Sequence, residues 1–462
     1  MSAFASEAEA VTWVFRSLRK LRGQPRLPDD RGRDPAPTRE LLRTLGLPAV
    51  AREYLVVTGS KGKGSTTAMT ARLLQAPGRR VGMLTSPHLV SWRERVRVDG
   101  QAIPSEDFLR ILAWLKPATE RIGARLGPRQ YFSPTGLFLA LALRWFDEQG
   151  VAAAVLEVGR GGRFDDVALA PNALSLVTPV VREHDFWLGP GLARIAWHKA
   201  GIIKAGSQVI SLPQSAPVLT ELEREARRQD ASMDVLTPAQ LAQPLSRRAQ
   251  GQRLRLAPFG DFDLPLRGRH QAANATLALR AARQVSARLG VKENPAAMAA
   301  RLATLRWPGR LEKLQDSPAL YVDGAVYRQS ALYALEAPGE ALARPLQVIL
   351  AVPDDKDYAG VIEALAPASD GLIFCETGRN PILRFPPADE LLALARAQGA
   401  KAVHVPPLEE ALARAEEGAG RDGTILLCGT HSILADVMLL RGRSFERLWD
   451  QGSGALAQGH GH

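Results

Sequence analysis

Short apolar runs alternate with helical patterns along most of the chain. In the first part, five runs of strand length are bounded by turn residues, at 55–58, 81–85, 152–157, 173–178 and 207–212. This alternation predicts a mainly parallel sheet covered by helices. Between Arg253 and Leu266, apolar and polar residues alternate around Pro-Phe-Gly-Asp, which predicts a β-hairpin. From His270 onward, apolar residues recur at helical spacing.

A second series of apolar runs follows the Trp-Pro-Gly sequence at 307–309, which breaks the preceding helical pattern. Its strand-like members lie at 320–322, 348–352, 372–375 and 425–428. We therefore expect two folded units, residues 1–305 and 306–442, each an α/β domain with its own sheet. Residues 443–462 end in a polar, glycine-rich sequence, and we predict that this tail is disordered.

The composition is that of a globular protein with more than one domain. The chain has 462 residues, of which 46% are hydrophobic and 23% charged, enough for two or three domains. The net charge is +11, but the 59 Lys and Arg residues are interleaved with 48 acidic residues. This balance favours an enzyme for anionic ligands, with no nucleic-acid partner. A nucleic-acid-stimulated NTPase is the alternative, because a basic run at 246–255 leads into the predicted hairpin.

The cysteine content and the apolar runs bear on the compartment. Cys375 and Cys428 each end an apolar run, so we predict buried thiols rather than a disulfide or a metal pair. No apolar stretch reaches the ~18 residues of a membrane span, and no secretory leader is recognised. We expect a cytoplasmic protein without a membrane partner.

The most informative segment is YLVVTGSKGKGST, from Tyr54 to Thr66: a strand, a glycine-rich turn with a lysine, and the start of a helix. Three glycines allow the backbone N–H groups to approach an anion, while the helix N-terminus and Lys63 add positive charge. This pattern predicts a cradle for the phosphates of a nucleoside triphosphate. The spacing differs from the general P-loop GxxxxGK[ST], and an ordinary strand-to-helix turn is the alternative for this segment alone.

Six further segments follow the loop, several of them where a parallel sheet would present its strand ends. They are TSPHLVSWRERVRV from Thr85, LEVGRGGRFDD from Leu156, REHDFWLGPGLARIAWHKAGIIK from Arg182, GRHQAANA from Gly268, WPGRLEKL from Trp307 and LYVDGAVY from Leu320. Taken in order, these segments resemble the folylpolyglutamate synthase and dihydrofolate synthase family, the folate branch of the Mur ligases. The resemblance extends from about Trp13 to Leu440. The ordered set is specific, whereas any single member is not.

The resemblance implies an α/β fold of Mur ligase architecture. It implies an N-terminal P-loop-type ATPase domain with a mainly parallel sheet, followed by a smaller C-terminal Rossmann-like α/β domain. The implied activity is that of an ATP-dependent amide ligase, which joins the amino group of glutamate to a carboxylate of dihydropteroate or a folate through an acyl phosphate. The implied cofactors are ATP and Mg²⁺, the partners are small molecules, and the enzyme is expected to be a monomer.

The resemblance also assigns residues to ATP. The loop residues that match are Gly59, Ser60, Lys61, Gly62, Lys63, Gly64, Ser65 and Thr66. Gln271 and Asn274 match the adenine side of the family site, and their separation by one helical turn places both amides on one face. Arg310 and Asp323 match residues of the second domain that reach the phosphates and the ribose, so the nucleotide is expected to bridge the two domains.

Magnesium is the second ligand that the resemblance implies. Ser65, Ser86, Glu157 and His184 match metal-binding positions, and Glu157 is a carboxylate that would be costly to bury without a cation. Lys199 matches a lysine that many Mur ligases carbamylate to bind a second magnesium. Lys63, Glu157, His184 and Lys199 are therefore the expected catalytic set. A surface histidine and a plain helix-surface lysine are the alternatives for His184 and Lys199.

Several positions depart from the family pattern. Val326 and Tyr327 stand where the family has a His-Asn pair close to the incoming glutamate. Ser133 replaces a glutamate expected near the pterin-type substrate, and Arg160 replaces an apolar residue and is predicted to add a cation near the phosphates. The sequence therefore leaves open the acceptor acid, the amine, the number of additions and carbamylation of Lys199. The alternatives are a Mur-type ligase for a non-folate acid or a non-glutamate amine, and an inactive nucleotide-binding paralogue.

Overall fold

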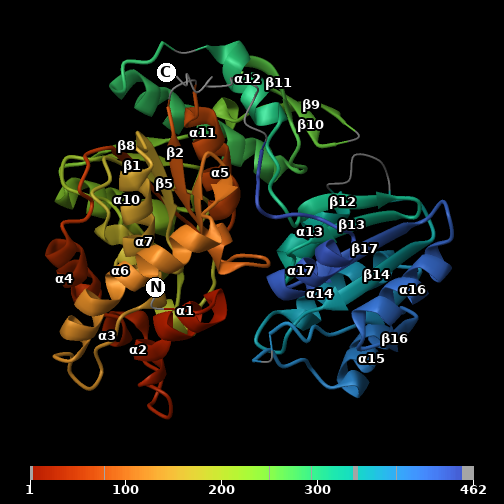
Figure 1. Ribbon diagram of the computed structural model, residues 1–462. Helices are drawn as coiled ribbons and strands as arrows, with labels where there is room; N and C mark the ends of the chain where they lie inside the picture. Colours follow the sequence, from red (N-terminus) through yellow and green to blue (C-terminus); the bar gives the residue numbers. More distant parts are fainter. Residues whose placement is uncertain are drawn as a thin grey trace, which may run out of the picture.

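The computed structural model describes residues 4–76, 79–248, 250–292, 294–336, 342–380 and 382–449. Among these residues, the first sheet has eight strands (Figure 1). In spatial order they are β4 (Gln101–Ala102), β3 (Val96–Val98), β2 (Val81–Leu84), β5 (Ala153–Glu157), β1 (Glu53–Thr58), β6 (Leu174–Val177), β7 (Gln208–Ser211) and β8 (Ser232–Val235). Strands β2 to β8 in this order are parallel, and β3 and β4 form an antiparallel edge.

Helices pack on both faces of this sheet because its central strands are buried on both sides, as is usual for parallel sheets. One core lies between the sheet and α5 and α11, and the other includes residues of α4, α6 and α7. The helices of this N-terminal part are α1 (Glu7–Val14), α2 (Arg16–Arg19), α3 (Asp29–Gly32), α4 (Ala36–Leu45), α5 (Lys63–Leu74), α6 (Ser105–Gly123), α7 (Pro134–Glu148), α8 (Asp185–Leu188), α9 (Leu192–Ala200), α10 (Ala216–Arg228), α11 (Arg269–Arg288) and α12 (Pro295–Ala303).

A small antiparallel sheet joins the N-terminal part before α11. It consists of β9 (Gln243–Arg247), β10 (Gln252–Leu256) and β11 (Gly260–Leu264). Strands β10 and β11 pair antiparallel around the Pro-Phe-Gly turn, which confirms the predicted hairpin.

The C-terminal part is built on a second sheet, in the order β12 (Arg310–Asp316), β13 (Ala319–Asp323), β17 (Thr424–Gly429), β14 (Leu346–Ala351), β15 (Gly371–Phe374) and β16 (Ala402–His404). All of these strands except β12 run parallel. Its helices are α13 (Arg328–Glu336), α14 (Tyr358–Leu365), α15 (Ala388–Ala397), α16 (Leu408–Ala419) and α17 (His431–Leu440). Two apolar clusters include residues of this sheet, so the predicted α/β fold class is confirmed for both parts.

The last described residues correct the predicted tail. Residues 443–449 are ordered against the rest of the protein, and Phe445, Leu448 and Trp449 are buried. The expectation of disorder was wrong here because three apolar side chains precede the glycine-rich end and pack into the hydrophobic cores of the two parts. Residues 450–462 lie outside the described residues.

Two further predictions concern the cysteines and the membrane. Cys375 and Cys428 are buried and unpaired, as expected. Within the described residues, every helix is too short or too polar to cross a bilayer.

Candidate active site

The loop between β1 and α5 is shaped by glycines that neighbouring atoms approach closely. Gly59 has φ of 139°, and a Cβ there would lie 1.9 Å from Thr178 Oγ1. Gly62 has φ of 88°, and a Cβ there would lie 2.6 Å from Asn274 Oδ1. The turn brings the chain into α5 at Lys63, where the first amides of the helix lack partners within the helix itself. This geometry suits an anion at the helix N-terminus.

Three ammonium groups surround the loop. Lys63 Nζ and Lys199 Nζ both donate to the Gly59 carbonyl, at 3.1 and 2.7 Å. Glu183 lies 3.1 Å from Lys199 Nζ and 3.8 Å from Lys61 Nζ. One carboxylate therefore faces three positive charges, and the surplus favours a polyanionic ligand such as a triphosphate.

Glu157 ends β5 beside the same loop and is 6% exposed. Its Oε2 accepts a hydrogen bond from the Ser86 main-chain N–H at 3.1 Å. Burial raises the pKa of Glu157 to about 7, although the positive charges of Lys63 and Arg310 act to lower it. The structure therefore brings Ser86 and Glu157 together at neighbouring strand ends.

His184 lies near enough to Lys63, Lys199 and Glu183 for their charges to act on it. It has φ of 56°, a left-handed conformation that is uncommon for histidine, and precedes α8. Burial lowers its pKa to about 4, so the imidazole is neutral at physiological pH. Its charged neighbours are Glu183, Arg160, Lys199 and Lys63, and Lys63 also acts on Glu157. The structure shows a hydrogen bond between Ser86 and Glu157, and a magnesium site that His184 shares with them stays a prediction.

The donor chemistry of the Ser86–Glu157 pair suits magnesium. Across the described residues, no group of three or more His, Cys, Asp and Glu side chains is arranged to hold a metal. Mg²⁺ does not need such a group, because it commonly takes one or two carboxylates together with waters and substrate phosphates. Glu157 with the hydroxyls of Ser65 and Ser86 is an oxygen set of that kind, next to the anion loop.

Gln271 and Asn274 share one face of α11, as their spacing predicts, and are each 2% exposed. Asn274 Nδ2 donates to Gln271 Oε1 at 3.1 Å, and Gln271 Nε2 donates to Ser65 Oγ at 3.3 Å. Both amides therefore brace the glycine loop directly. Their predicted role beside adenine stays a prediction.

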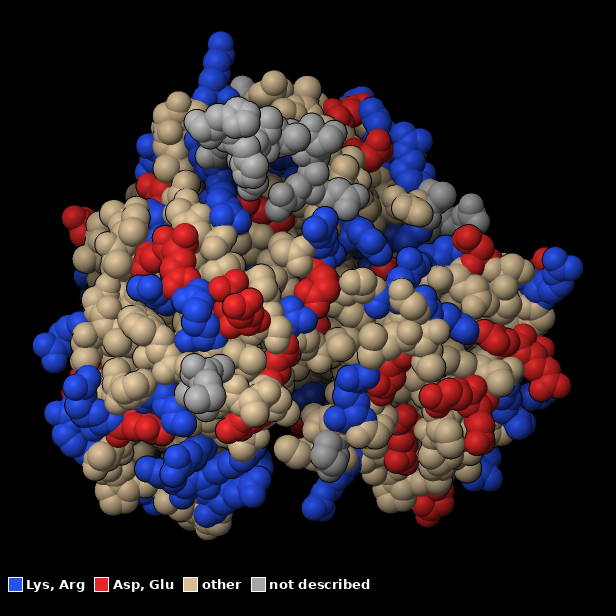
Figure 2. All heavy atoms as spheres, viewed as in Figure 1, with Lys and Arg blue, Asp and Glu red and all other residues tan. Residues whose placement is uncertain are grey.

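The C-terminal part contributes Arg310 and Asp323, which lie opposite each other on β12 and β13. The Asp323 carboxylate accepts from the Leu311 N–H at 2.8 Å, and burial raises its pKa to about 6 despite the charge of Arg310. Arg310 acts electrostatically on both Glu157 and Lys61, so its side chain faces the loop across the two parts. Figure 2 shows a notch between these parts at the lower middle of the view.

The positions that depart from the family pattern have definite places. The Tyr327 ring lies over the Lys61 ammonium, with Nζ 4.0 Å from the ring centroid. Ser133 caps α7 by accepting from the Thr135 N–H at 3.2 Å. Arg160 does not turn toward the loop: its guanidinium pairs with Asp29 at 2.5 Å and stacks over Trp187. Its charge also acts on His184, and the predicted position of Arg160 near the phosphates stays a prediction.

A cavity of about 730 Å³ lies where Arg160 points, between the chain around 18–33, the start of α7 and Trp187. Within the part of the chain that the structure describes, four of its exposed arginines have no ion-pair partner: Arg22, Arg26, Arg31 and Arg129. Figure 2 shows Lys and Arg gathered at the lower left, over α2 and the loop after it. Sequence reasoning missed this cavity, although the arginine-rich run at 22–33 is a visible signal.

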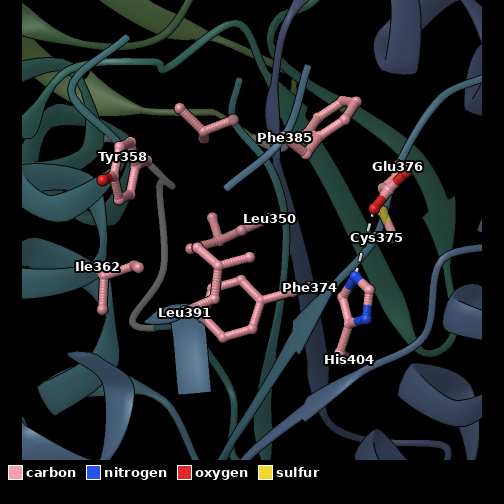
Figure 3. Close-up of a pocket in the computed structure, with 10 residues that line it drawn as sticks. Leu350, Tyr358, Ile362, Phe374, Cys375, Glu376, Phe385, Leu391 and His404 are labelled. Carbon is pink, nitrogen blue, oxygen red and sulfur yellow. Dashed lines mark ion pairs between the residues drawn. The ribbon is translucent and has the colours of Figure 1, made fainter. Parts of the chain in front are cut away.

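A second cavity lies in the C-terminal sheet, at the ends of β14, β15 and β16 (Figure 3). Its volume is about 10 Å³, and a cavity of this size holds a single water at most. Glu376 pairs with His404 at 3.4 Å, and burial raises the pKa of Cys375 to about 12, so its thiol is inert. This cavity is part of the core and is not a ligand site.

Comparison with known proteins agrees with this geometry. Residues 309–431 match the family described as "Mur ligase, glutamate ligase domain". The folylpolyglutamate synthase of Lacticaseibacillus casei is 31% identical over 71% of this chain and 77% of its own length. The chain belongs to the folylpolyglutamate synthase and dihydrofolate synthase family. The dihydrofolate synthase/folylpolyglutamate synthase of Bacillus subtilis is also similar, at 30% identity over 73% of this chain and 79% of its own.

Solved structures of the same family extend the match to most of the fold. The Mycobacterium tuberculosis folylpolyglutamate synthase, solved with ADP and AMPPCP, superposes with a TM-score of 0.81 at 28% identity, over 90% of this chain and 97% of that one. The predicted family, Mur ligase architecture and ligase class are therefore confirmed.

Proposed function

We propose that this ligase joins the amino group of glutamate to a carboxylate of dihydropteroate or a folate, driven by ATP. The observation that carries the proposal is the glycine loop at 59–64 beside the Ser86–Glu157 pair, with Arg310 facing both from the C-terminal part. The named relatives carry out reactions of this class, and one related structure, at 25% identity and a TM-score of 0.77, is described as a complex with AMPPCP and folate.

The residues around the loop have complementary roles in this proposal. The α5 amides and Lys63 bind the triphosphate, while Gln271 and Asn274 hold the loop in shape on the nucleotide side. Ser65, Ser86 and Glu157 would hold Mg²⁺, which neutralises phosphate charge when bound. Arg310 adds a further cation from the C-terminal part. Asp323 accepts from the Leu311 N–H and lies within range of the Arg310 charge, and a contact of Asp323 with the ribose remains part of the proposal.

Two chemical steps follow from this arrangement. The γ-phosphoryl group passes to the acceptor carboxylate, giving an acyl phosphate and ADP, while Lys63 and the backbone donors stabilise the charge that develops on the transferred oxygens. The amine of glutamate, in its neutral form, then attacks the acyl carbon. Phosphate leaves from the tetrahedral intermediate, and the amide bond is complete.

Lys199 is poised for modification in this proposal. Burial lowers its pKa to about 8, so a larger share of the amine is neutral and able to react with CO₂ than for an exposed lysine. The ammonium form instead donates to Gly59 and Glu183. We expect native mass spectrometry in bicarbonate buffer to detect one added CO₂. The Lys199→Arg variant, which cannot form the carbamate, is the control.

The cavity beside Arg160 is our candidate for the acceptor acid. We expect the double substitution Arg22→Gln and Arg26→Gln to raise KM for the acceptor about 3- to 10-fold, because two rim cations each contribute up to about 1 kcal/mol toward an anion. KM for ATP should not change. The effect should shrink in high salt, which screens exposed charges. Arg414→Gln, an exposed position on α16, is the control.

Tyr327 favours a second candidate, a ligase for a different amine or acid. Its ring lies beside Lys61 at the second position of the family's His-Asn pair, Val326 stands at the histidine position, and Ser133 lacks the expected carboxylate. This candidate keeps the same phosphoryl chemistry and changes only the two substrates.

One experiment separates these possibilities. Phosphate release is measured with dihydropteroate or tetrahydrofolate plus glutamate, and then with a panel of other carboxylates and amines, and the products are identified by mass spectrometry. Glutamate addition to a pterin acid supports the first proposal, and its product masses give the number of additions. A product formed only from other substrates supports the second candidate. Nucleotide binding without substrate-stimulated ADP formation in any mixture would identify an inactive paralogue.

We further propose a monomeric enzyme that acts in the cytoplasm, with the boundary between its two domains near residue 305. Two buried, unpaired thiols suit a reducing compartment. The basic run at 246–255 is partly neutralised within β10 and β11, since Arg253 pairs with Asp263 and Arg255 with Asp261. This pairing speaks against a nucleic-acid site there.

A further inference from the structure

The end of the described chain returns from the C-terminal part to the N-terminal part (Figure 1). We call residues 444–449 the strap. Phe445 packs into a core of the second sheet, whereas Leu448 and Trp449 are buried in the core that contains α5 and α11. The Arg306 N–H donates to the Leu448 carbonyl at 2.7 Å, so the strap runs beside the first connection between the two parts.

Arg97, on the antiparallel edge of the first sheet, binds the strap. Its guanidinium donates to the Phe445 carbonyl at 2.7 Å and to the Glu446 carbonyl at 3.0 Å. Its other acceptors are the carbonyls of Gly100, at 3.1 Å, and Glu94, at 3.0 Å. Arg97 is 2% exposed, and a buried cation depends on such bonds. Two of the four carbonyls that hold this charge therefore belong to the strap.

Glu94 links Arg97 to the loop at 86–91. Its Oε2 lies 3.8 Å from the Arg97 guanidinium. The same carboxylate accepts three consecutive main-chain N–H groups, from Leu89 at 3.2 Å, Val90 at 2.8 Å and Ser91 at 2.6 Å. Three charge-assisted bonds to one buried carboxylate fix the course of this loop.

The loop at 86–91 contacts both parts of the protein. It begins at Ser86, whose N–H donates to Glu157, and the side chains of Leu89 and Val90 pack against the C-terminal core that contains Phe445. Leu448 of the strap lines the small pocket that also includes Ser86 and Glu157. The strap, Arg97, Glu94 and this loop thus form a continuous set of contacts that ends at the Ser86–Glu157 pair.

We infer that the strap is a positioning element for the active site. Through Arg97 and Glu94 it holds the loop at 86–91 so that Ser86 stays beside Glu157. Because the strap contacts both parts of the protein, this arrangement also depends on the position of the C-terminal part. The effect on metal binding rests on the proposed function, whereas the effect on the loop does not.

The first test compares two truncations, one after Arg443, which removes the strap, and one after Trp449, which retains it. Hydrogen exchange is measured by mass spectrometry in peptides that cover 86–94 and in peptides from β1. Without the strap, we expect exchange at Leu89, Val90 and Ser91 to be at least about tenfold faster, with β1 unchanged. The truncation after Trp449 should match the full chain.

A full-chain variant tests the same inference in case the truncated protein does not fold. Arg97→Lys keeps the charge but loses the fork that reaches Phe445 and Glu446, and it should give the same local increase in exchange. Arg80→Lys, at an exposed arginine paired with Asp99 in the turn between β3 and β4, is the matched control. Equal exchange at 89–91 in Arg97→Lys and the full chain would overturn the inference. An increase of the same size in β1 would overturn it as well, because it would indicate general loosening.

The second measurement concerns the metal. In Arg97→Lys we expect the Mg²⁺ concentration for half-maximal ADP formation to rise about tenfold, as for residues that orient metal ligands. The affinity for ADP without divalent cations should change less than about twofold, because among the described residues no backbone hydrogen bond joins the glycine loop to the strap. An unchanged Mg²⁺ requirement would overturn the link to the metal. If the full chain ligates nothing, the proposed function fails, and the exchange data still decide the role of the strap.

Discussion

Replacing Glu157 with glutamine should lower kcat/KM for ATP-driven ligation by about 10²- to 10³-fold, the usual cost of losing one preorganised electrostatic partner of the transition state. The substitution keeps the shape of the side chain but removes the negative charge that faces Lys63, Arg310 and Arg95. A neutral amide is a poor ligand for magnesium compared with a carboxylate. Steady-state kinetics with the identified acceptor provide the measurement. Glu376→Gln, in the C-terminal sheet, is the control and should keep full activity.

The same substitution has an effect on stability that does not depend on turnover. Burial raises the pKa of Glu157 to about 7, so in metal-free protein the folded state binds its proton more tightly than the unfolded state. This contribution to stability is complete below the unfolded pKa of about 4.5 and is lost as pH rises through about 7. Glu157→Gln should therefore flatten the fall in melting temperature between pH 5 and 8. A variant with full activity and an unchanged pH profile would exclude Glu157 from the site.

Much of the fold could be predicted because the central strands are fully buried. Runs such as Leu55 to Val57 and Ile425 to Cys428 are apolar throughout, so they can be recognised as strands without knowing which strands lie beside them. The strands that were not predicted lie at or next to a sheet edge: β3, β4, β8, β9, β12 and β16. β3, β4 and β16 are only two or three residues long, and the identity of such strands depends on pairing rather than on composition.

The candidate site was predictable only where it follows strand ends. Glu157 ends β5, and Ser86 lies two residues after the neighbouring parallel strand β2, so their contact follows from topology. The partnership of Arg97 with the strap could not be predicted, because it joins residues about 350 positions apart through main-chain carbonyls. Every residue has a main-chain carbonyl, so a contact with one cannot be recognised from the type of amino acid. The arginine-lined cavity is likewise assembled from separate loops, and only the run at 22–33 gives a local signal.

Replacing Gly59 with alanine should strongly weaken nucleotide binding and lower the stability of the fold. The new Cβ would lie 1.9 Å from Thr178 Oγ1 and 2.8 Å from the Thr178 carbonyl, at a φ of 139° that alanine rarely adopts. Backbone strain and overpacking each cost about 1–3 kcal/mol, so a loss of about 2–5 kcal/mol in the free energy of unfolding is expected. The displaced carbonyl would also release Lys63 and Lys199. Calorimetric titration with ADP should show at least about 100-fold weaker binding, equivalent to the loss of several charge-assisted contacts.

The origin of this effect can be tested with two further variants. Gly206→Ala also has positive φ, at 64°, but meets no atom within 4 Å, so it should cost only about 1–2 kcal/mol and leave ADP affinity unchanged. Adding Thr178→Ala to Gly59→Ala removes the closest clash and should recover part of the lost stability. Recovery must remain partial, since the Thr178 carbonyl and the backbone conformation are unchanged. Wild-type affinity in Gly59→Ala itself would mean that the loop adapts freely, and the close approach of Gly59 to β6 would then not determine its shape.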